Sequence, residues 1–460
     1  MKGIMLLALY NLLFVLASPA ILLILLAKRR CRRGLPFRLG LKLPALPAGG
    51  TPAAGTVIWV HAVSLGEVVA VTPLVKSLHA RYPGRPLVVS TVTETGREAV
   101  EQRLAGMASH CYAPLDYPWA VARLIDHLRP GLYLFVETEL WPNLLTSLAA
   151  RGVPTVMLNG RISTRSFIRQ QWPVVRQIYR FILRRLSLCL MQSDRDAQRI
   201  IALGADPEKV LHTGNLKFDQ PPVSLQEDRL APVTGWISRQ SHPPVLVAGS
   251  THPGEEELLI SACEQIRKER PLALILAPRH IERTEEIERM LVQRGLPSTR
   301  RSRLAMHTGS LQAVPESWVL LLDTRGELGA VYHYAAITFV GGTLAPVGGH
   351  NLLEPAAWGK PVLFGPHTDH CEEIAELLES AGGGIRVRTV DQIVQVCRQL
   401  LDSPVDLDQV GQRARSALQE NQGALERSLD AMAGFLDRRP SRNDAMPSPT
   451  CPDQAGNGLR

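Results

Sequence analysis

The longest apolar stretch lies near the amino end of the chain. Residues 4–27 form a run of 24 without a charged side chain, and about 20 apolar residues suffice to cross the hydrocarbon core of a bilayer. Lys2 precedes the run, whereas residues 28–33 are nearly all basic, so the positive-inside rule places the following chain in the cytoplasm. A cleaved signal peptide is the alternative, since residues 17–20 resemble a cleavage site. Because the apolar run resumes after that site, we predict an uncleaved anchor over residues 1–27.

After the anchor, short apolar runs alternate with helical periodicity. Such runs, bounded by turn residues, are typical of buried strands, and the helices between them indicate β-α-β units with a mostly parallel sheet. The first set of expected strands is 57–60, 87–91, 132–136, 155–158 and 188–192. The pattern pauses over a proline-rich stretch, and a second set follows at 245–248, 273–276, 319–322, 337–340 and 361–364.

This pattern predicts an α/β fold with two doubly wound, Rossmann-like domains and a ligand cleft between them. The length agrees, because 460 residues are too many for one ordinary domain of about 100–200 residues. The expected divisions are an anchor (1–27), a basic juxtamembrane segment and linker (28–55), a first domain (56–220), an interdomain linker (221–243), a second domain (244–435) and a tail (436–460). The tail shows no apolar period and is expected to be disordered.

Charge is distributed unevenly along the chain. Lys and Arg number 51 against 43 Asp and Glu, which gives a net charge of +8. Residues 28–42 and 161–185 each hold seven basic and no acidic residues, so the remainder of the chain carries a net charge of −6. Basicity therefore belongs to two local surfaces, and no nucleic-acid partner is expected.

Metal and disulfide chemistry are not indicated. The seven cysteines are widely spaced without a C-x-x-C pair, which suggests neither a zinc site nor a disulfide framework and fits a reducing, cytosolic compartment. Residues 194–196 read Asp-Arg-Asp, a pattern that holds a metal–diphosphate in some sugar transferases. Here Ser193 follows an expected strand, and a serine N-cap with acids in the first helical turn accounts for the pattern. We expect no metal and no cofactor.

The first motif with candidate chemistry, His61-Ala-Val-Ser-Leu-Gly-Glu67, directly follows the first expected strand. Loops at the carboxyl ends of parallel strands face the ligand crevice. Glu67 falls near the start of a helix, where it would serve as a general base if the crevice desolvates it and raises its pKa. A first-turn glutamate that interacts with the helix dipole is an equally good explanation. The spacing alone leaves both open.

A second motif, Glu137-Thr-Glu-Leu-Trp-Pro-Asn143, also follows an expected strand. Glu137 and Glu139, separated by one residue, are not expected to form a paired acid/base site. One of them could cap the helix that begins near Pro142. Glu137 is the stronger functional candidate of the two.

A third feature is an arginine tract within residues 161–185. A spacing of four places several of its members along one helical face, with Pro173 as a kink. A solvated face normally mixes charges, whereas these 25 residues contain no acid, which favours a phosphate-bearing or anionic membrane partner. With an anchor at the amino end, a membrane is the better explanation. The members singled out are Arg161, Arg165, Arg169, Arg176 and Arg180.

Four polar loops follow successive strands of the second half, and together they predict a nucleotide-binding edge. They contain Pro278-Arg-His280, Arg325-Gly-Glu327, Gly341-Gly-Thr343 and Gly348-Gly-His-Asn-Leu-Leu-Glu-Pro355. Glycines let backbone N–H groups approach a phosphate, Arg279 can neutralise it, and Glu354 can accept from ribose hydroxyls. The loops match neither a Walker loop nor a G-x-G-x-x-G fingerprint, which disfavours ATPases and dehydrogenases.

These motifs, in this order, resemble those of the 3-deoxy-D-manno-octulosonic acid (Kdo) transferases of lipopolysaccharide assembly. The resemblance runs from the anchor to about residue 435, and it also includes Asn159-Gly-Arg-Ile-Ser163 and Gly214-Asn-Leu-Lys-Phe-Asp219. It implies a GT-B glycosyltransferase fold, with the acceptor on the N-terminal domain and CMP on the C-terminal domain. The implied reaction is inverting transfer of Kdo from CMP-Kdo to the lipid A precursor, without a metal, at the cytoplasmic side of the inner membrane.

The resemblance also implies roles for individual residues. Glu67 matches the catalytic base, and Glu137 and Lys217 match positions that assist the transition state. The positions that match CMP contacts are Pro278, Arg279, Arg325, Gly326, Glu327, Asn351, Leu352, Leu353 and Glu354. Members of the family commonly carry a hydrophobic residue where this chain has Arg325, so that contact is expected through the backbone. The anchor and the arginine face would hold the acceptor domain against the anionic membrane surface.

Two rival functions remain compatible with these residues. A UDP-sugar transferase or epimerase of the same fold would also use the loops of the second half, although an epimerase needs neither an anchor nor an arginine face. A membrane-tethered protein that binds anionic lipid without chemistry would explain both basic segments and leave those loops unused. Binding of a cytidine nucleotide discriminates between these functions.

Overall fold

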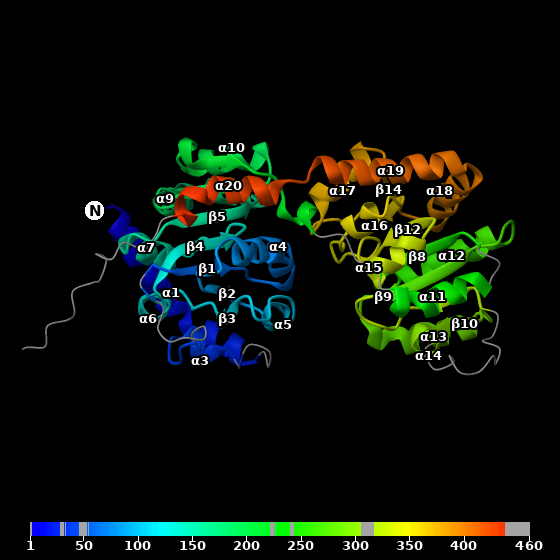
Figure 1. The fold of residues 1–460 in the computed structure, drawn as a ribbon, viewed down its shortest axis with the longest axis horizontal. Helices are drawn as coiled ribbons and strands as arrows, with labels where there is room; N and C mark the ends of the chain where they lie inside the picture. Colours follow the sequence, from blue (N-terminus) through cyan, green and yellow to red (C-terminus); the bar gives the residue numbers. More distant parts are fainter. Residues whose placement is uncertain are drawn as a thin grey trace, which may run out of the picture. The chain divides into compact units, whose positions relative to one another are not determined.

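The computed structural model describes residues 2–27, 32, 34–45, 53, 55–220, 225, 227–239, 243–304 and 317–437. It divides into two compact units, Met1–Gln220 with Gln422–Arg460 and Pro221–Asn421 (Figure 1). Each unit is built on a seven-stranded sheet whose paired neighbours are all parallel. The expected tail from residue 438 onward, and most of the basic cluster at 28–33, lie outside the described residues.

The sheet of the first unit has the order β3-β2-β1-β4-β5-β6-β7. Its strands are β1 (Val57–His61), β2 (Leu87–Thr91), β3 (Ser109–Tyr112), β4 (Pro130–Val136), β5 (Thr155–Gly160), β6 (Leu188–Met191) and β7 (Val210–His212). The chain order runs outward in both directions from the adjacent pair β1 and β4. In open α/β sheets, ligands bind beyond the carboxyl ends of the strands at such a switch point.

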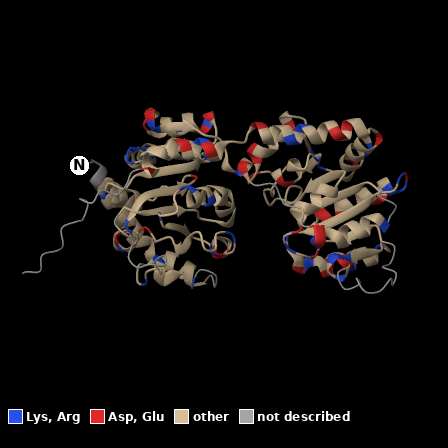
Figure 2. Ribbon diagram, viewed as in Figure 1, with Lys and Arg blue, Asp and Glu red and all other residues tan. Residues whose placement is uncertain are grey.

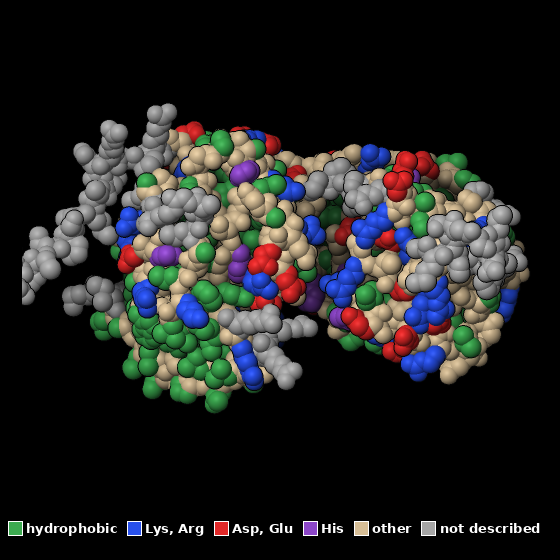
Figure 3. Space-filling model, turned by 60° about the horizontal axis from the view of Figure 1, so that its bottom comes forward, with side chains coloured by type: hydrophobic (Ala, Val, Ile, Leu, Met, Phe, Trp, Pro, Cys, Tyr) green, Lys and Arg blue, Asp and Glu red, His purple; other side chains and the backbone are tan. Residues whose placement is uncertain are grey.

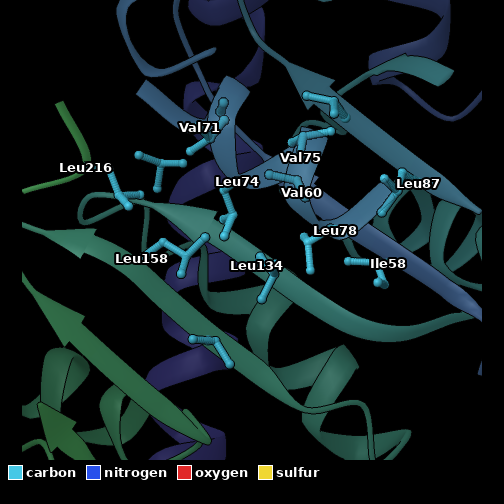
Figure 4. Close-up of a cluster of buried hydrophobic side chains, with 14 of the residues drawn as sticks. Ile58, Val60, Val71, Leu74, Val75, Leu78, Leu87, Leu134, Leu158 and Leu216 are labelled. Carbon is cyan, nitrogen blue, oxygen red and sulfur yellow. The ribbon is translucent and has the colours of Figure 1, made fainter. Parts of the chain in front are cut away.

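Helices cover both faces of this sheet because its strands bury residues on both sides. Ile58 and Val60 of β1 pack with α4 (Leu65–Arg81), and Figure 4 shows Val71, Leu74, Val75 and Leu78 of that helix directed onto the strands. Trp59 packs on the opposite face. The other helices of the unit are α3 (Leu35–Arg38), α5 (Glu94–Arg103), α6 (Pro118–Leu128), α7 (Pro142–Ala150), α8 (Thr164–Gln170), α9 (Pro173–Leu183), α10 (Asp194–Leu203), η1 (Pro207–Lys209) and η2 (Leu216–Asp219).

The sheet of the second unit has the order β10-β11-β9-β8-β12-β13-β14, with its switch point between β8 and β12. Its strands are β8 (Val245–Thr251), β9 (Ala273–Pro278), β10 (Ser298–Arg300), β11 (Val319–Leu321), β12 (Ile337–Val340), β13 (Val362–Phe364) and β14 (Gly384–Arg386). Its helices are α11 (Glu227–Arg239), α12 (Glu255–Arg267), η3 (Ile281–Arg283), α13 (Thr284–Gln293), α14 (Arg301–Leu304), α15 (Leu328–Val331), η5 (Tyr332–Tyr334), α16 (Leu353–Ala357), α17 (Glu372–Ser380), α18 (Val390–Asp402) and α19 (Pro404–Glu420).

The last described helix, α20 (Ala424–Leu436), corrects the expected end of the second domain at residue 435. The apolar side chains Leu429 and Met432 complete the core that α4 and β1 form in the first unit. The carboxylate of Asp219 accepts hydrogen bonds from the backbone N–H groups of Gly423 and Leu425, at 2.7 and 2.5 Å. The chain therefore returns to the first unit after Asn421.

Helix α1 (Lys2–Ala27) lies against the first unit through polar contacts along one side. Tyr10 Oη donates to Asp116 Oδ2 at 3.0 Å, Asn143 Nδ2 donates to Asn11 Oδ1 at 2.6 Å, and the Tyr117 hydroxyl bonds Ser18. The same helix exposes Met5, Leu9, Leu12, Leu13, Val15, Leu16, Leu23 and Leu26. Figure 3 shows hydrophobic side chains gathered on one face of the first unit. In the described part of the chain, one helix, spanning Met5–Ala27, is long and apolar enough to cross a membrane.

Candidate active site

The switch point of the first sheet brings the two acidic motifs to neighbouring strands. Glu67 lies in the first turn of α4, directly after β1, and Glu137 is the residue that follows β4. The Glu67 carboxylate accepts from the Val63 backbone N–H at 2.8 Å and from the Ser64 hydroxyl at 3.0 Å. Glu67 therefore closes the start of the helix and also stands at the edge where a ligand would bind.

The environment of Glu67 favours its protonated form. Burial raises the pKa of Glu67 to about 7, and the negative charges of Glu137 and Glu139 act in the same direction. The hydrogen bonds from Val63 and Ser64 partly oppose this shift of the pKa. A carboxyl group that titrates near neutral pH can take up a proton from a hydroxyl group in a reaction at that pH.

Glu137 and Lys217 form an ion pair in the same unit. Lys217 Nζ lies 3.9 Å from Glu137 Oε1, and both side chains are about one-third exposed. The backbone of Glu137 has a φ of 58°, a left-handed conformation that costs free energy in a residue with a side chain and occurs frequently at functional sites. Glu139 instead accepts from the Trp141 indole N–H at 2.8 Å. The start of α7 is capped by Asp116, and not by either glutamate of the motif.

A buried network of three amide side chains holds the loop that carries Lys217. Asn159 Oδ1 accepts from the Leu216 backbone N–H at 2.9 Å, and Asn215 Oδ1 accepts from the Lys217 backbone N–H at 3.0 Å. Gln192 links the other two, because it donates to the Asn159 carbonyl at 2.9 Å and accepts from Asn215 Nδ2 at 3.2 Å. The network explains why the separate Asn159 and Gly214–Asp219 motifs meet at one place.

Replacement of Asn159 by alanine is expected to lower kcat about tenfold with little change in the KM for the donor. The substitution removes the acceptor for the Leu216 N–H group and so loosens the position of Lys217, and one lost buried hydrogen bond costs about 1–3 kcal/mol of stability. Steady-state kinetics and thermal unfolding measure the two effects. Asn421→Ala is the control, since that side chain donates to the Ala417 carbonyl at the end of its own helix. A rise in the donor KM with unchanged kcat would contradict the positioning role.

The expected nucleotide-contacting residues lie at the carboxyl edge of the second sheet. Pro278 ends β9, and the exposed Arg279 follows with its N–H bonded to the Thr251 carbonyl at 3.0 Å. Asn351 Nδ2 donates to Glu354 Oε1 at 3.1 Å, and Asn351 Oδ1 accepts from the Leu353 N–H group at 3.1 Å. Leu352 and Leu353 are buried, so neither side chain is exposed to a ligand.

Arg325 and Glu327, at the two ends of the segment 325–327, have different surroundings. The buried Glu327 carboxylate accepts from Arg229 at 3.2 Å, from Arg301 at 2.9 Å and from the Thr324 hydroxyl at 2.5 Å. Its side chain therefore links α11, α14 and the turn that carries Glu327. Arg325 is exposed and lies 3.4 Å from Glu282.

Glu255 is a prominent residue of this edge that the sequence analysis missed. Its buried carboxylate accepts from five backbone N–H groups, at 2.8–3.1 Å, those of His252, Gly342, Thr343, Leu344 and Ala345. The N–H groups of Gly342 and Thr343, which were expected to approach a phosphate, are thus already engaged. The only sequence signal is an acid in the first turn of α12, one of three consecutive glutamates there.

The arginine tract forms two helices and not one kinked helix. Pro173 is the first residue of α9, because proline lacks an N–H group and fits the first helical turn. Arg165 and Arg169 are exposed on α8, Arg176 and Arg180 are exposed on α9, and Arg161 is half-buried before them. Figure 2 shows Lys and Arg together with Asp and Glu on the helices of both units.

Two further expectations concern Ser193 and the cysteines. The Ser193 hydroxyl caps α10 by accepting from the Asp196 N–H group at 3.1 Å, and Asp196 is buried, where it binds the Ile162 N–H group at 2.7 Å. The D-x-D pattern is therefore a helix start. Five described cysteines are buried. Across the described ranges, no three His, Cys, Asp or Glu side chains gather as metal ligands would.

Comparison with known proteins identifies the family to which the chain belongs. Residues 34–220 match the family described as 3-deoxy-D-manno-octulosonic-acid transferase (kdotransferase). The 3-deoxy-D-manno-octulosonic acid transferase of Haemophilus influenzae is 35% identical over 387 residues, which span 83% of this chain and 87% of that protein. The protein of the same description from Bordetella pertussis is 36% identical over 426 residues, or 89% of this chain and 95% of that protein.

A solved structure supports the fold class. The UDP-GlcNAc 2-epimerase of Neisseria meningitidis matches 82% of this chain and 99% of its own, with a TM-score of 0.56 and 14% sequence identity. At that identity the likeness concerns the fold alone, which is GT-B-like with two parallel α/β units, as the sequence predicted. The relatives, both above 30% identity over most of their length, decide the rest: this chain belongs to the family of 3-deoxy-D-manno-octulosonic acid transferases and is a glycosyltransferase.

Proposed function

We propose that this chain transfers Kdo from CMP-Kdo to a hydroxyl group of the lipid A precursor (lipid IVA), with inversion at the anomeric carbon. Membership of the family supports the sugar that is transferred. The single observation that carries the mechanism is Glu67, a carboxyl group at the switch point of the first sheet whose pKa is raised to about 7.

In the proposed step, the acceptor oxygen forms a bond to the anomeric carbon while the bond between that carbon and the phosphate oxygen breaks. The hydroxyl proton passes to the Glu67 carboxylate, and the electron pair of the breaking bond leaves with CMP. Attack on the side opposite the leaving group inverts the configuration. Glu67 thus returns to its protonated form once in each turnover and must release that proton to solvent.

Positive charge near the reacting atoms stabilises the transition state in this proposal. Lys217, tethered to Glu137 at 3.9 Å, would act beside the acceptor, and the exposed Arg279 would neutralise the phosphate of the departing CMP. Asn351 and Glu354 would bind the nucleotide at the carboxyl edge of the second sheet. Because side chains supply these charges, transfer is expected to continue when divalent cations are removed by a chelator.

The proposed acceptor is an anionic lipid, and the first unit carries groups suited to a membrane surface. Helix α1 is apolar on its exposed side, and the large side chains Ile168, Trp172 and Val174 are exposed among the arginines of α8 and α9. Indole rings and arginines favour the interface between headgroups and acyl chains. We therefore place the protein at the cytoplasmic side of the inner membrane, where α1 would raise the effective concentration of enzyme at its acceptor.

The test is transfer from CMP-Kdo to lipid IVA by the full chain in detergent, with chelator present and the products identified by mass. A product heavier by one or more Kdo residues is expected, and the mass counts the sugars added. UDP-N-acetylglucosamine serves as the alternative donor. Transfer from the UDP-sugar alone would overturn the donor, and binding of CMP without transfer to lipid IVA would overturn the acceptor.

A further inference from the structure

Two histidines meet at the switch point of the second sheet, and no role has been given to either. His252 follows β8 and His350 lies in the long loop after β12, yet their Nε2 atoms are 2.8 Å apart. The rings are nearly parallel, with 11° between their planes and 5.1 Å between their centroids. A third ring, His280, stands edge-on to His252 at 5.9 Å.

The contact between the two Nε2 atoms holds one hydrogen, because one nitrogen must donate and the other must accept. If both rings carried a proton at Nε2, two donors would face each other and the bond would break. The pair thus has two distinct states, a closed state with one shared proton and an open state in which both Nε2–H groups are free to donate. The accepting ring can gain its Nε2–H by moving its own proton from Nδ1, which leaves the pair uncharged, or by taking up a second proton, which makes the pair cationic.

The surroundings of the pair are fixed and electropositive. The backbone N–H of His252 is bound to the Glu255 carboxylate at 2.8 Å, and both rings lie close to the bare backbone of Gly342. Arg279, Arg283, His280 and His370 face the two rings, and Glu255 is the acidic group that acts on His252. That carboxylate accepts from the five backbone N–H groups described above, and its negative charge raises the pKa of His252 against the effect of the neighbouring cations.

Burial lowers the pKa of both histidines, and the pKa of His350 falls to about 4. The positive charges of Arg279 and of the neighbouring histidines lower both values further. At neutral pH the pair is therefore closed and uncharged. An anion placed between the rings and Arg279 would reverse this preference, because it stabilises a second proton and accepts from both Nε2–H groups.

We propose that His252 and His350, together with Arg279, form a subsite for an oxyanion of the sugar nucleotide, and that binding opens the pair with uptake of one proton. The inference rests on the proposed function, because it takes the donor to be a CMP-sugar. The oxyanion is a phosphate or the sugar carboxylate, and both would be recognised by the same two N–H donors. The donor consequently binds more tightly as the pH falls.

The experiment is calorimetric titration of the full chain with CMP, cytidine and CMP-Kdo at pH 7.5, in two buffers of different ionisation enthalpy. The difference in apparent enthalpy counts the protons taken up. The variants His252→Gln and His350→Gln keep an amide for hydrogen bonding but cannot titrate. His333→Gln is the matched control, since His333 lies in the same unit and packs on Trp358. Circular dichroism confirms that each variant is folded.

The wild type and His333→Gln are expected to take up about one proton more than either pair variant. Excess proton uptake with CMP would identify the phosphate as the bound oxyanion. Excess proton uptake with CMP-Kdo alone would identify the sugar carboxylate. Cytidine is expected to cause no excess proton uptake in either case. Equal proton uptake by the wild type and both pair variants would overturn the subsite and leave the proposed function intact. Absence of binding by every cytidine ligand would instead overturn the proposed donor, and the subsite with it.

Discussion

Replacement of Glu67 by glutamine is expected to lower the rate of Kdo transfer by about 10²–10⁴-fold, the contribution typical of a positioned general base. Glutamine preserves the size of the side chain and can still accept from the Val63 N–H group, so the start of α4 is retained. It cannot accept the hydroxyl proton. Transfer measured by product mass under saturating donor and acceptor gives the loss directly, and an activity above one-tenth of the wild type would remove Glu67 from the role of base.

The pH profile supplies an independent check on this residue. Because the pKa of Glu67 is raised to about 7, the carboxylate fraction, and with it the rate, is expected to fall about tenfold for each pH unit below 7. Glu139 contributes to that raised pKa through its negative charge. Glu139→Gln should therefore retain transfer and move the acid limb of the profile to lower pH. An unmoved limb would indicate that another group titrates.

Stability distinguishes loss of the base from loss of the fold. A buried carboxyl group with a raised pKa binds its proton more tightly in the folded state, so the wild type loses stability as the pH rises from 4.5 to about 7. The side chain of the glutamine variant does not ionise, so that variant keeps its stability over this pH range. Its unfolding temperature should equal that of the wild type near pH 4 and exceed it at pH 8, whereas a variant that is merely misfolded would be less stable at both.

Replacement of Glu255 by alanine is expected to lower the free energy of unfolding by about 3 kcal/mol or more, because five buried or partly buried N–H groups lose their acceptor at once. The loop 342–345 should also lose its fixed position, which weakens CMP binding. Hydrogen exchange of the amides of this loop gives the local effect, urea denaturation the global one and calorimetry the affinity.

The neighbouring Glu257 offers a matched control for this experiment. It lies in the same first turn of α12 and has the same favourable interaction with the helix dipole, but its side chain is exposed. Glu257→Ala should change stability by less than about 1 kcal/mol and leave the exchange of the loop amides unaltered. If the two alanine variants proved equally stable, the buried carboxylate would not be what holds the Gly-Gly-Thr loop in place.

Most of the fold could be predicted from local patterns, because the central strands of a parallel sheet are buried on both faces and read as continuous apolar runs. All ten expected strands are present: 87–91 and 337–340 have the observed bounds, and the other eight differ at one end by one to three residues. Four strands were missed, namely β3, β7, β10 and β14, each only three or four residues long. β3, β7, β10 and β14 occupy the sheet edges, where partial exposure admits polar residues such as those of Ser298–Arg300.

In the candidate sites too, residues that directly follow a strand could be predicted, whereas contacts between distant segments could not. Glu67 and Glu137 could each be placed at the ligand-binding edge because each follows a strand, and strands of one parallel sheet end at one edge. The role of Glu255 could not be predicted, because its acceptor atoms meet N–H groups 87 to 90 residues further along the chain. The same holds for the pair of His252 and His350, which are 98 residues apart. A side chain's partners across such separations depend on which strands become neighbours.

The sequence by itself determined the apolar first helix, the alternation of strands and helices, the two-unit α/β architecture and the motifs that indicated the family. These features depend on periodicity and on contacts between residues close in the chain. Only the tertiary structure decided that α20 completes the core of the first unit, that α1 is held by Asn143 and Asp116, and that Glu255 occupies the N–H groups of the glycine loop. Those contacts join distant segments, and their energy comes from burial and hydrogen bonds that exist once the sheets have assembled.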